Sequence, residues 1–404
     1  MNFLSPFMPK VLLHGRRLNG QIIKPFVRQI QAGGEDIEFW AAGLFEEDLH
    51  FADGQSRFGI EKCLSYSLEV TGNSRNEVSG KSSFSRIVSK ITKRLSRFGE
   101  KEKWKQILSS IDVMHFHGLF ACGFSNRLLD AVPTIPIVVS CWGSDVLRSH
   151  SPQILKAQQT LLFRAKAITV SSPEFREIVL AKYGQHLREK IVITQFSPTL
   201  EEVFSLNHQE ASDNFRKRES LSTDKIIVGI AHNGHSENQH REILSGIHNL
   251  PRQIREKIHL LLPMTYGGSK EHRKSVEEQL EDSGFEYTIL TEFLSEQEVG
   301  ELRHAIDVFI YAPVSDAFSA TVSQALAAGS ECIIGSWLPY KTRIKAGFLY
   351  TEIDEPGQAG EALQDVVSTK LGDIGRQKHN RELSREFFNP EVLGKQWTNV
   401  YRKV

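Results

Sequence analysis

The chain has 404 residues, of which 40% are hydrophobic and 24% are charged, so it can bury large cores and is predicted to form two domains. Lysine plus arginine and aspartate plus glutamate both number 49, so the charge balance gives no indication of a nucleic-acid partner. No apolar run reaches the roughly 20 residues of a membrane span, and the N-terminus lacks a signal-peptide pattern. The four cysteines have neither zinc-ligand nor disulfide-framework spacing, which predicts a cytoplasmic protein without a metal site.

Short β-rich runs alternate with longer helical patterns along most of the chain. The runs predicted to be buried parallel strands are 10–15, 36–43, 111–118, 135–143, 167–172, 191–196, 225–234, 257–268, 287–294, 307–313 and 330–337. This alternation predicts an α/β fold with doubly wound sheets. The polar stretch 205–224 lacks apolar periodicity and is predicted to be a linker or exposed helix. It would separate a first domain, 1–204, from a second domain that begins at residue 225.

Small side chains dominate residues 315–329, SDAFSATVSQALAAG, which follow a predicted strand. In a parallel sheet, ligands bind beyond the carboxyl ends of the strands, where helix N-termini favour anions. Small residues would let a phosphate approach the backbone, and Asp316 and Gln324 could hold a sugar or ribose hydroxyl. The alternative is structural, with Thr321 and Gln324 as a capping box and the alanines as helix-packing residues. Asp316 or Ser319 would then be a simple helix cap.

The same stretch resembles the donor-binding signature of the retaining family-four glycosyltransferases, in which two glutamates precede Ala-x-Ala-x-Gly. Asp316, one methylene shorter, stands at the first glutamate, and the uncharged Gln324 stands at the second. The resemblance implies a GT-B fold, in which two Rossmann-like domains face a cleft and the second, 225–385, binds the nucleotide-sugar. The closing segment, 386–404, looks like the C-terminal helix that returns to the first domain in this fold. Donor contacts are also implied at the start of the signature helix, by Ser319, Ala320 and Thr321.

Two further segments are similar to donor-binding elements of such enzymes. Residues 227–244 resemble the phosphate-facing loop of the family's second domain, and 261–280 resemble a Gly-rich segment of bacterial fucosamine transferases. These resemblances imply contacts to the diphosphate and the nucleotide from Asn233, Gly234, His235, Arg241 and Tyr266. The alternatives are an Asx turn that caps a helix in the first segment and a simple Gly-Gly turn in the second.

Two strand ends of the first domain resemble family segments that lie at the cleft. His115 and His117 share one face of the predicted strand, and a neutral imidazole can accept a proton from an acceptor hydroxyl. His117 and Asp145 are therefore the candidate catalytic residues, while Trp142 replaces the family's histidine and could stack on a sugar. The alternatives are a strand-end histidine in a satisfied polar contact and a tryptophan that only fills its loop.

Residues 84–98 place aromatic and aliphatic side chains at helical spacing, with basic residues mostly on the other side. This pattern is typical of an interfacial helix on an anionic membrane, and it would make the protein peripheral to the membrane. An ordinary helix that packs on its own core would show the same pattern.

Together these features predict a glycosyltransferase that moves a sugar from a nucleotide-sugar to a glycan or lipid-linked acceptor. Catalysis would rest on positioning and on stabilisation of the diphosphate by helix N-termini and by arginine or histidine, without a metal or another cofactor. The family-four resemblance favours retention, the fucosamine transferase resemblance favours inversion, and the stereochemistry stays open. Two other classes are a nucleotide-sugar epimerase with the GT-B fold and a non-catalytic GT-B-like partner protein.

Overall fold

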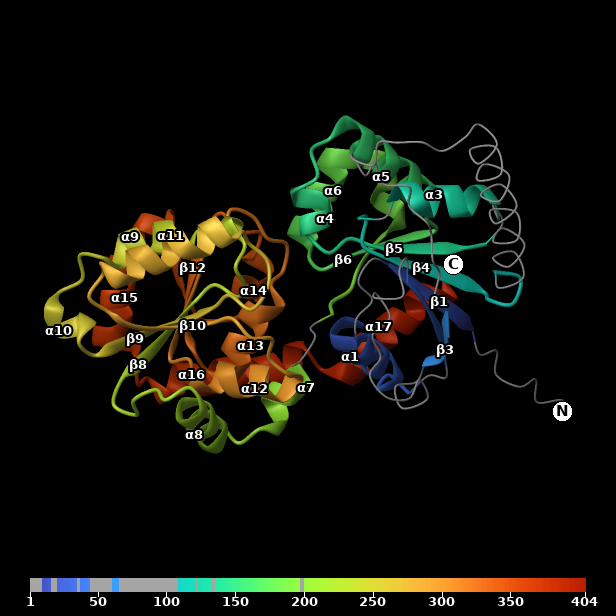
Figure 1. The fold of residues 1–404 in the computed structure, drawn as a ribbon. Helices are drawn as coiled ribbons and strands as arrows, with labels where there is room; N and C mark the ends of the chain where they lie inside the picture. Colours follow the sequence, from blue (N-terminus) through green and yellow to red (C-terminus); the bar gives the residue numbers. More distant parts are fainter. Residues whose placement is uncertain are drawn as a thin grey trace, which may run out of the picture. The chain divides into compact units, whose positions relative to one another are not determined.

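The computed structural model describes residues 9–15, 20–34, 37–43, 60–64, 108–120, 122–131, 135–196 and 200–404. The chain divides into two compact units (Figure 1). The first unit consists of Met1–Val170, Val179–Thr194 and Pro390–Val404, and the second of Ser171–Ile178 and Gln195–Asn389. The chain therefore passes from one unit to the other after residue 170, within α6 (Pro173–Tyr183), after residue 194 and before residue 390.

The first unit is built on a parallel sheet that has seven strands within the described residues, in the order β3-β2-β1-β4-β5-β6-β7. These strands are β1 (Lys10–Gly15), β2 (Glu38–Gly43), β3 (Ile60–Leu64), β4 (Val113–His117), β5 (Ile137–Ser140), β6 (Ala167–Val170) and β7 (Ile191–Ile193). Its helices are α1 (Gly20–Gln31), α3 (Cys122–Ala131), α4 (Ser144–Leu147), α5 (Pro152–Arg164), part of α6, the 3₁₀ helix η3 (Gln185–Lys190) and α17 (Pro390–Arg402). This order reverses between β1 and β4, as in a doubly wound sheet.

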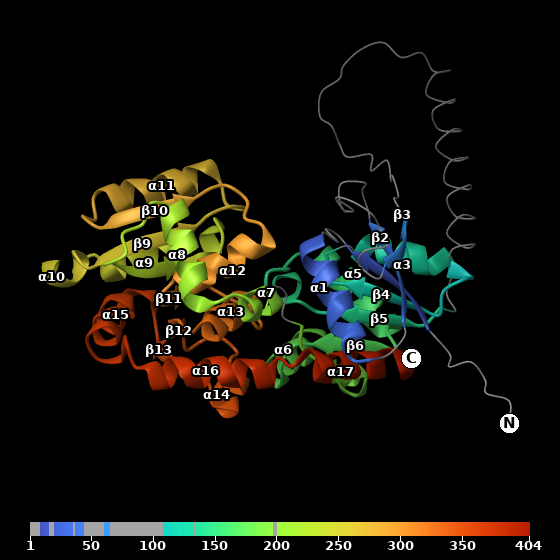
Figure 2. The same cartoon turned by 90° about the horizontal axis from the view of Figure 1, so that it is seen from below.

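The C-terminal helix α17 lies beside α1 in the first unit (Figure 2). Gly33 and Gly394 let the two backbones touch, since a Cβ on Gly33 would lie 2.7 Å from the Gly394 carbonyl carbon. Trp397 and Tyr401 of α17 are buried, and the Trp397 ring packs edge-on against Phe26 of α1, with centroids 4.8 Å apart. Helix α17 therefore completes the core of the first unit.

The second unit has a parallel sheet of six strands within the described residues, in the order β10-β9-β8-β11-β12-β13. They are β8 (Ile226–Ile230), β9 (Ile258–Pro263), β10 (Glu286–Leu290), β11 (Val308–Tyr311), β12 (Glu331–Gly335) and β13 (Thr351–Ile353). Its other helices are α7 (Leu200–Ser205), α8 (His208–Arg218), η4 (Ser236–Asn238), α9 (His240–Ile247), α10 (Arg252–Arg255), α11 (Lys270–Glu281), α12 (Glu296–Ala305), α13 (Ala320–Ala328), α14 (Lys341–Ala346), η5 (Pro356–Gln358), α15 (Ala359–Asp365), the π-helix η6 (Val366–Lys370) and α16 (Ile374–Phe387).

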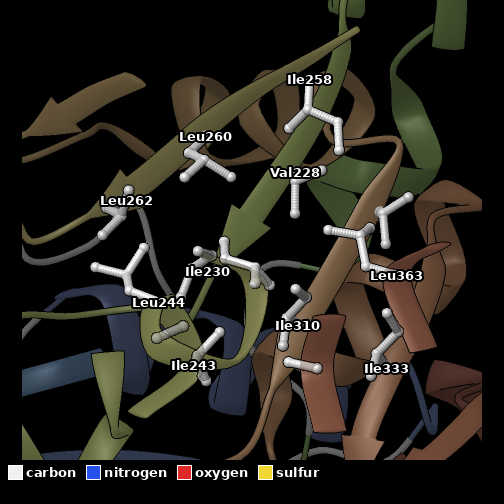
Figure 3. Packing of buried hydrophobic residues seen from close by; sticks show 14 of the residues in the cluster. Val228, Ile230, Ile243, Leu244, Ile258, Leu260, Leu262, Ile310, Ile333 and Leu363 are labelled. Carbon is white, nitrogen blue, oxygen red and sulfur yellow. The ribbon is translucent and has the colours of Figure 1, made fainter. Parts of the chain in front are cut away.

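The core of the second unit lies between the sheet and helices α9, α11 and α15 (Figures 1 and 3). Figure 3 shows Val228, Ile230, Leu260 and Ile310 of the strands packed with Ile243 of α9. Every one of these side chains is fully buried, and each full burial of an aliphatic side chain stabilises the fold by about 1.5–3 kcal/mol. Helices α12, α13 and α16 pack together on the other face of the sheet.

The polar stretch predicted to be a linker or exposed helix contains α8, capped by Asn207, whose side chain accepts from the Glu210 backbone N–H. Helix α8 packs against α12 within the second unit, and Arg218 and Glu301 join the two helices at 2.6 Å. The stretch is thus a packed part of the second unit and not only a connection. Within the described part of the chain, no helix combines the length and apolarity needed to span a bilayer.

Candidate functional site

Two glycine-containing loops meet at the carboxyl edge of the second sheet, one after β8 and the other after β9. The Gly234 N–H donates to the Tyr266 carbonyl at 2.8 Å, and the Gly268 N–H donates to His235 Nδ1 at 3.3 Å. Gly268 has a φ of +72°, and a Cβ at this position would overlap the Gly234 carbonyl oxygen. Only glycine fits a positive φ with no room for a Cβ, and it lets the backbones of the two loops contact each other directly.

Asn233 organises the loop after β8. Its Oδ1 accepts from the His235 backbone N–H at 3.0 Å and from Asn238 Nδ2 at 2.6 Å, which is the Asx turn proposed above as the structural alternative. Its Nδ2 lies 3.4 Å from the Tyr266 hydroxyl, so Asn233 also orients that ring. Tyr266 is 45% exposed and lies at the surface of this edge.

Histidines lie in this loop and behind it. His240, the first residue of α9, is fully buried, and its Nδ1 lies 3.4 Å from His272 Nε2. Burial lowers the pKa of His240 to about 4, so the ring is neutral at pH 7. His235 is half-buried between the two loops, whereas Arg241 is exposed on α9.

The signature helix α13 begins at Ala320, with Ser319 as its cap. The Ser319 hydroxyl accepts from the Val322 N–H at 3.3 Å, and Thr321 is buried in the first turn. The capping box of Thr321 and Gln324 does not form, because Gln324 lies within the helix and its Oε1 accepts from Arg303 Nε at 3.0 Å. Burial lowers the pKa of Arg303 to about 10, and both Arg303 and Gln324 are buried.

Asp316 lies in the loop between β11 and α13 and is half-buried. Its Oδ2 accepts a hydrogen bond from the Tyr340 hydroxyl, which orients the carboxylate. The same loop is tied to the loop after β8, since the Val314 N–H donates to the Glu237 carbonyl at 2.8 Å and Gln239 Nε2 donates to the Ala312 carbonyl at 2.6 Å. Three loops of adjacent strands β9, β8 and β11 therefore form one continuous edge.

In the first unit, Asp145 holds two strand-end loops together. Its carboxylate is fully buried and accepts from the backbone N–H groups of Leu119, Trp142, Gly143 and Val146 at 2.8–3.0 Å. Burial raises the pKa of Asp145, and the four backbone hydrogen bonds oppose that rise. In this structure Asp145 orients the loop that carries Trp142, and its role in catalysis stays a prediction.

His115 and His117 of β4 are both buried but have different surroundings. His115 lies in a polar chain, with Nδ1 2.7 Å from the Tyr401 hydroxyl and Nε2 2.7 Å from Ser140 Oγ. Burial and the neighbouring His117 lower the pKa of His115 well below its usual value. The His117 ring stacks on Trp142, with centroids 5.6 Å apart and planes at 20°, and meets Phe26 edge-on at 4.7 Å.

Most of the predicted donor-binding residues lie together at one sheet edge of the second unit: Asn233, Gly234, His235, Tyr266, Asp316, Ser319, Ala320 and Thr321. The other two do not join them, since Arg241 is exposed to solvent and Gln324 is buried with Arg303. Sequence reasoning did not single out Tyr340 or Arg303, because each contact joins residues 24 or 21 positions apart. Among the described residues, His, Cys, Asp and Glu side chains form no cluster suited to a metal ion. The membrane-binding prediction for 84–98 lies outside the described residues.

Neither a protein-family model nor a curated protein sequence matches this chain. Solved structures do match it over nearly its full length. The Anabaena protein Alr3699/HepE in complex with UDP and glucose has a TM-score of 0.72 and 12% identity, covering 98% of this chain and 100% of that one. The chain has the GT-B fold. Sucrose-phosphate synthase from Thermosynechococcus elongatus shares this GT-B architecture, with a TM-score of 0.70, 13% identity and 98% coverage of both chains.

A third GT-B structure, the UDP-forming α,α-trehalose-phosphate synthase from Burkholderia vietnamiensis, has a TM-score of 0.68 and 10% identity, and covers 98% of this chain and 100% of its own. At such low identity the likeness establishes the fold. The predicted α/β class with two Rossmann-like domains is therefore confirmed.

Proposed function

We propose that this protein is a glycosyltransferase that takes a sugar from a nucleoside diphosphate sugar. The observation that carries the proposal is the continuous edge of the second sheet, where the start of α13 presents first-turn backbone N–H groups and the neighbouring loops present an exposed tyrosine and an oriented carboxylate. Backbone amides at such an edge suit a diphosphate, because first-turn amides lack partners within the helix. We assign Tyr266 to the nucleotide and Asp316 to a hydroxyl of the sugar.

Uridine diphosphate is the nucleotide we propose first. Support comes from the GT-B neighbours, one of which was solved with UDP and glucose and also with UDP-glucose, while another is described as UDP-forming. His235, placed by Asn233 and the second loop, would add a hydrogen bond to the diphosphate. With side-chain donors and backbone amides at this edge, stabilisation of the leaving group would rest on preorganised dipoles and would not need a metal.

The first unit would bind the acceptor, a glycan or lipid-linked sugar. His117 and Trp142 form a stacked pair at the ends of β4 and β5, and Asp145 fixes the loop of Trp142. A stacked indole suits a sugar face, and a buried imidazole at a strand end suits a hydrogen bond with the acceptor hydroxyl. We propose His117 as the acceptor contact, Asp145 as its supporting carboxylate, and 84–98 as the segment that meets an anionic membrane.

The test is thermal unfolding with a panel of nucleoside diphosphates and their sugars, followed by assay of UDP release. A ligand at 100 times its dissociation constant stabilises the folded state by about 2.7 kcal/mol, which is readily seen as a rise in Tm. We expect UDP and UDP-glucose to raise Tm, and Asp316→Ala to weaken UDP-glucose more than UDP. Epimerised UDP-sugar without UDP release would indicate the epimerase, and no stabilisation by any nucleotide would indicate the non-catalytic partner.

A further inference from the structure

Two residues that follow β12 form a clamp that binds the turn before α13. This clamp consists of Tyr340 and Arg343, which come after the strand next to β11 in the sheet. Both side chains are buried, and both bind residues of the turn Asp316–Ser319 or of the first turn of α13. Neither residue belongs to the signature that the turn resembles.

Tyr340 makes two hydrogen bonds with one hydroxyl. It donates to Asp316 Oδ2 and accepts from the Ser319 backbone N–H at 3.0 Å. Burial and the carboxylate of Asp316 raise the pKa of Tyr340 well above its usual value, so the phenol keeps its proton and continues to donate. The hydroxyl therefore sets the orientation of the Asp316 carboxylate relative to the cap of α13.

Arg343 holds the other side of the same turn. Its Nη2 donates to the Ser319 carbonyl and to Ser323 Oγ, each at 2.9 Å, and its guanidinium carbon lies 3.8 Å from the centre of the Phe318 ring. Burial lowers the pKa of Arg343, while interactions with Tyr340, Tyr350 and Asp316 act in the opposite direction. A positive charge thus lies behind the turn that carries the Asp316 carboxylate.

Packing alone does not explain a buried arginine in this position. Arg343 Nε and Nη1 are buried and have no hydrogen-bond partner among the described residues, and burying unsatisfied donors of a cation is costly. An apolar side chain of similar size would pack the first turn of α13 without that cost. The cost is explained if the charge and the hydrogen bonds serve the carboxylate of the turn.

We propose that Tyr340 and Arg343 are positioning residues that fix Asp316 and the start of α13 in the geometry needed to hold the sugar of the donor. The inference rests on the proposed function, and it adds two residues that act on the donor site through Asp316. Asp316 is one methylene shorter than the glutamate of the resembled signature, so a small rotation displaces its oxygens from a sugar hydroxyl. A hydroxyl that binds Oδ2 and a cation behind the turn remove that freedom.

The experiment is a double-mutant cycle that combines Asp316→Ala with Tyr340→Phe, read by isothermal titration of UDP and UDP-glucose and by kcat and KM for UDP release. We expect Tyr340→Phe to leave the affinity for UDP within about twofold and to lower kcat/KM for UDP-glucose about tenfold. In the Asp316→Ala background the same change should have little further effect, since its action passes through the carboxylate. Tyr287→Phe, on strand β10, is the matched control and should behave as wild type.

Arg343→Lys provides a second variant, because it retains the charge while the two-point hold on Ser319 and Ser323 is lost. It should also lower kcat/KM for UDP-glucose, with Arg252→Lys on exposed α10 as control. If Tyr340→Phe and Arg343→Lys weaken UDP and UDP-glucose equally, or if their effects add fully to that of Asp316→Ala, the two residues only hold the fold and the inference is wrong. A wild-type protein that binds no nucleotide contradicts the proposed function and the inference with it.

Discussion

At the scale of single residues, the buried carboxylate of Asp145 has the clearest structural role. Asparagine at this position keeps the size but offers one oxygen and places an NH₂ group against backbone N–H donors. We expect Asp145→Asn to lower the free energy of unfolding by about 2–4 kcal/mol, since buried donors lose their acceptors. Urea unfolding measures this, with the exposed neighbour substitution Ser144→Ala as control. A loss of transferase activity at unchanged stability would instead support the catalytic role predicted from the sequence.

His240 should make the stability of the protein depend on pH. Its folded pKa is about 4, below the usual value of 6.5, so this contribution is fully present above pH 6.5 and is lost as pH falls towards 4. At low pH the unfolded chain binds a proton at His240 that the folded chain does not bind. This difference lowers the free energy of unfolding by about 3 kcal/mol at most. Unfolding free energies at pH 7 and pH 4.5 should differ less in His240→Gln than in wild type. An equal difference between the two pH values in wild type and in His240→Gln would contradict the assignment.

The residues of the site show what local patterns can predict. Ser319 is one of the candidate caps because serine before a helical stretch satisfies free N–H groups, and the structure has this cap. The partners of Asp316 and Gln324 could not be predicted, since Tyr340 lies just before α14 and Arg303 lies on α12. Such contacts depend on how the elements pack in three dimensions, and no local residue spacing in the sequence indicates them.

At the scale of elements, the joint between the loops after β8 and β9 should tolerate no side chain. Gly268→Ala forces a Cβ into the Gly234 carbonyl at a positive φ, so we expect a loss of about 3 kcal/mol and at least a tenfold loss of UDP affinity. Gly372→Ala is the matched control, since Gly372 has a φ of +95° and nothing lies within 4 Å of the place that a Cβ would take. It should cost only about 1–2 kcal/mol for the backbone conformation. Equal effects of the two substitutions would show that the joint is not constrained.

The elements themselves were largely predictable, because strand and helix patterns are local. Each of the eleven predicted runs contains a strand of the structure, and the last residues of most runs lie in the loop beyond it. Two strands of the structure, β3 and β13, were not predicted. They are five and three residues long and contain charged residues, so they lack a long apolar run. The polar segment with α8 also lacked a signal, because its contacts with α12 include ion pairs in addition to apolar packing.

At the scale of the whole molecule, each unit has its own sheet and core, and the chain returns to the first unit through α17. Trp397 is fully buried there, against Phe26 and with its ring 5.6 Å from that of His115. We expect Trp397→Ala to destabilise the first unit by about 3–5 kcal/mol, because a large cavity opens between α17 and α1. Hydrogen exchange read by mass spectrometry should show faster exchange in α1 and β4, while β8, β9 and β11 keep their protection.

The matched change in the second unit is Leu260→Ala, which opens a cavity in the core beside β8. It should produce the opposite pattern, with faster exchange in β8 and β9 and unchanged exchange in β4. If either substitution accelerates exchange equally in both units, the two cores unfold as one cooperative body. If the patterns separate as expected, the stability of the proposed donor-binding edge depends on the second core alone, and substitutions in α17 should change activity only through the first unit.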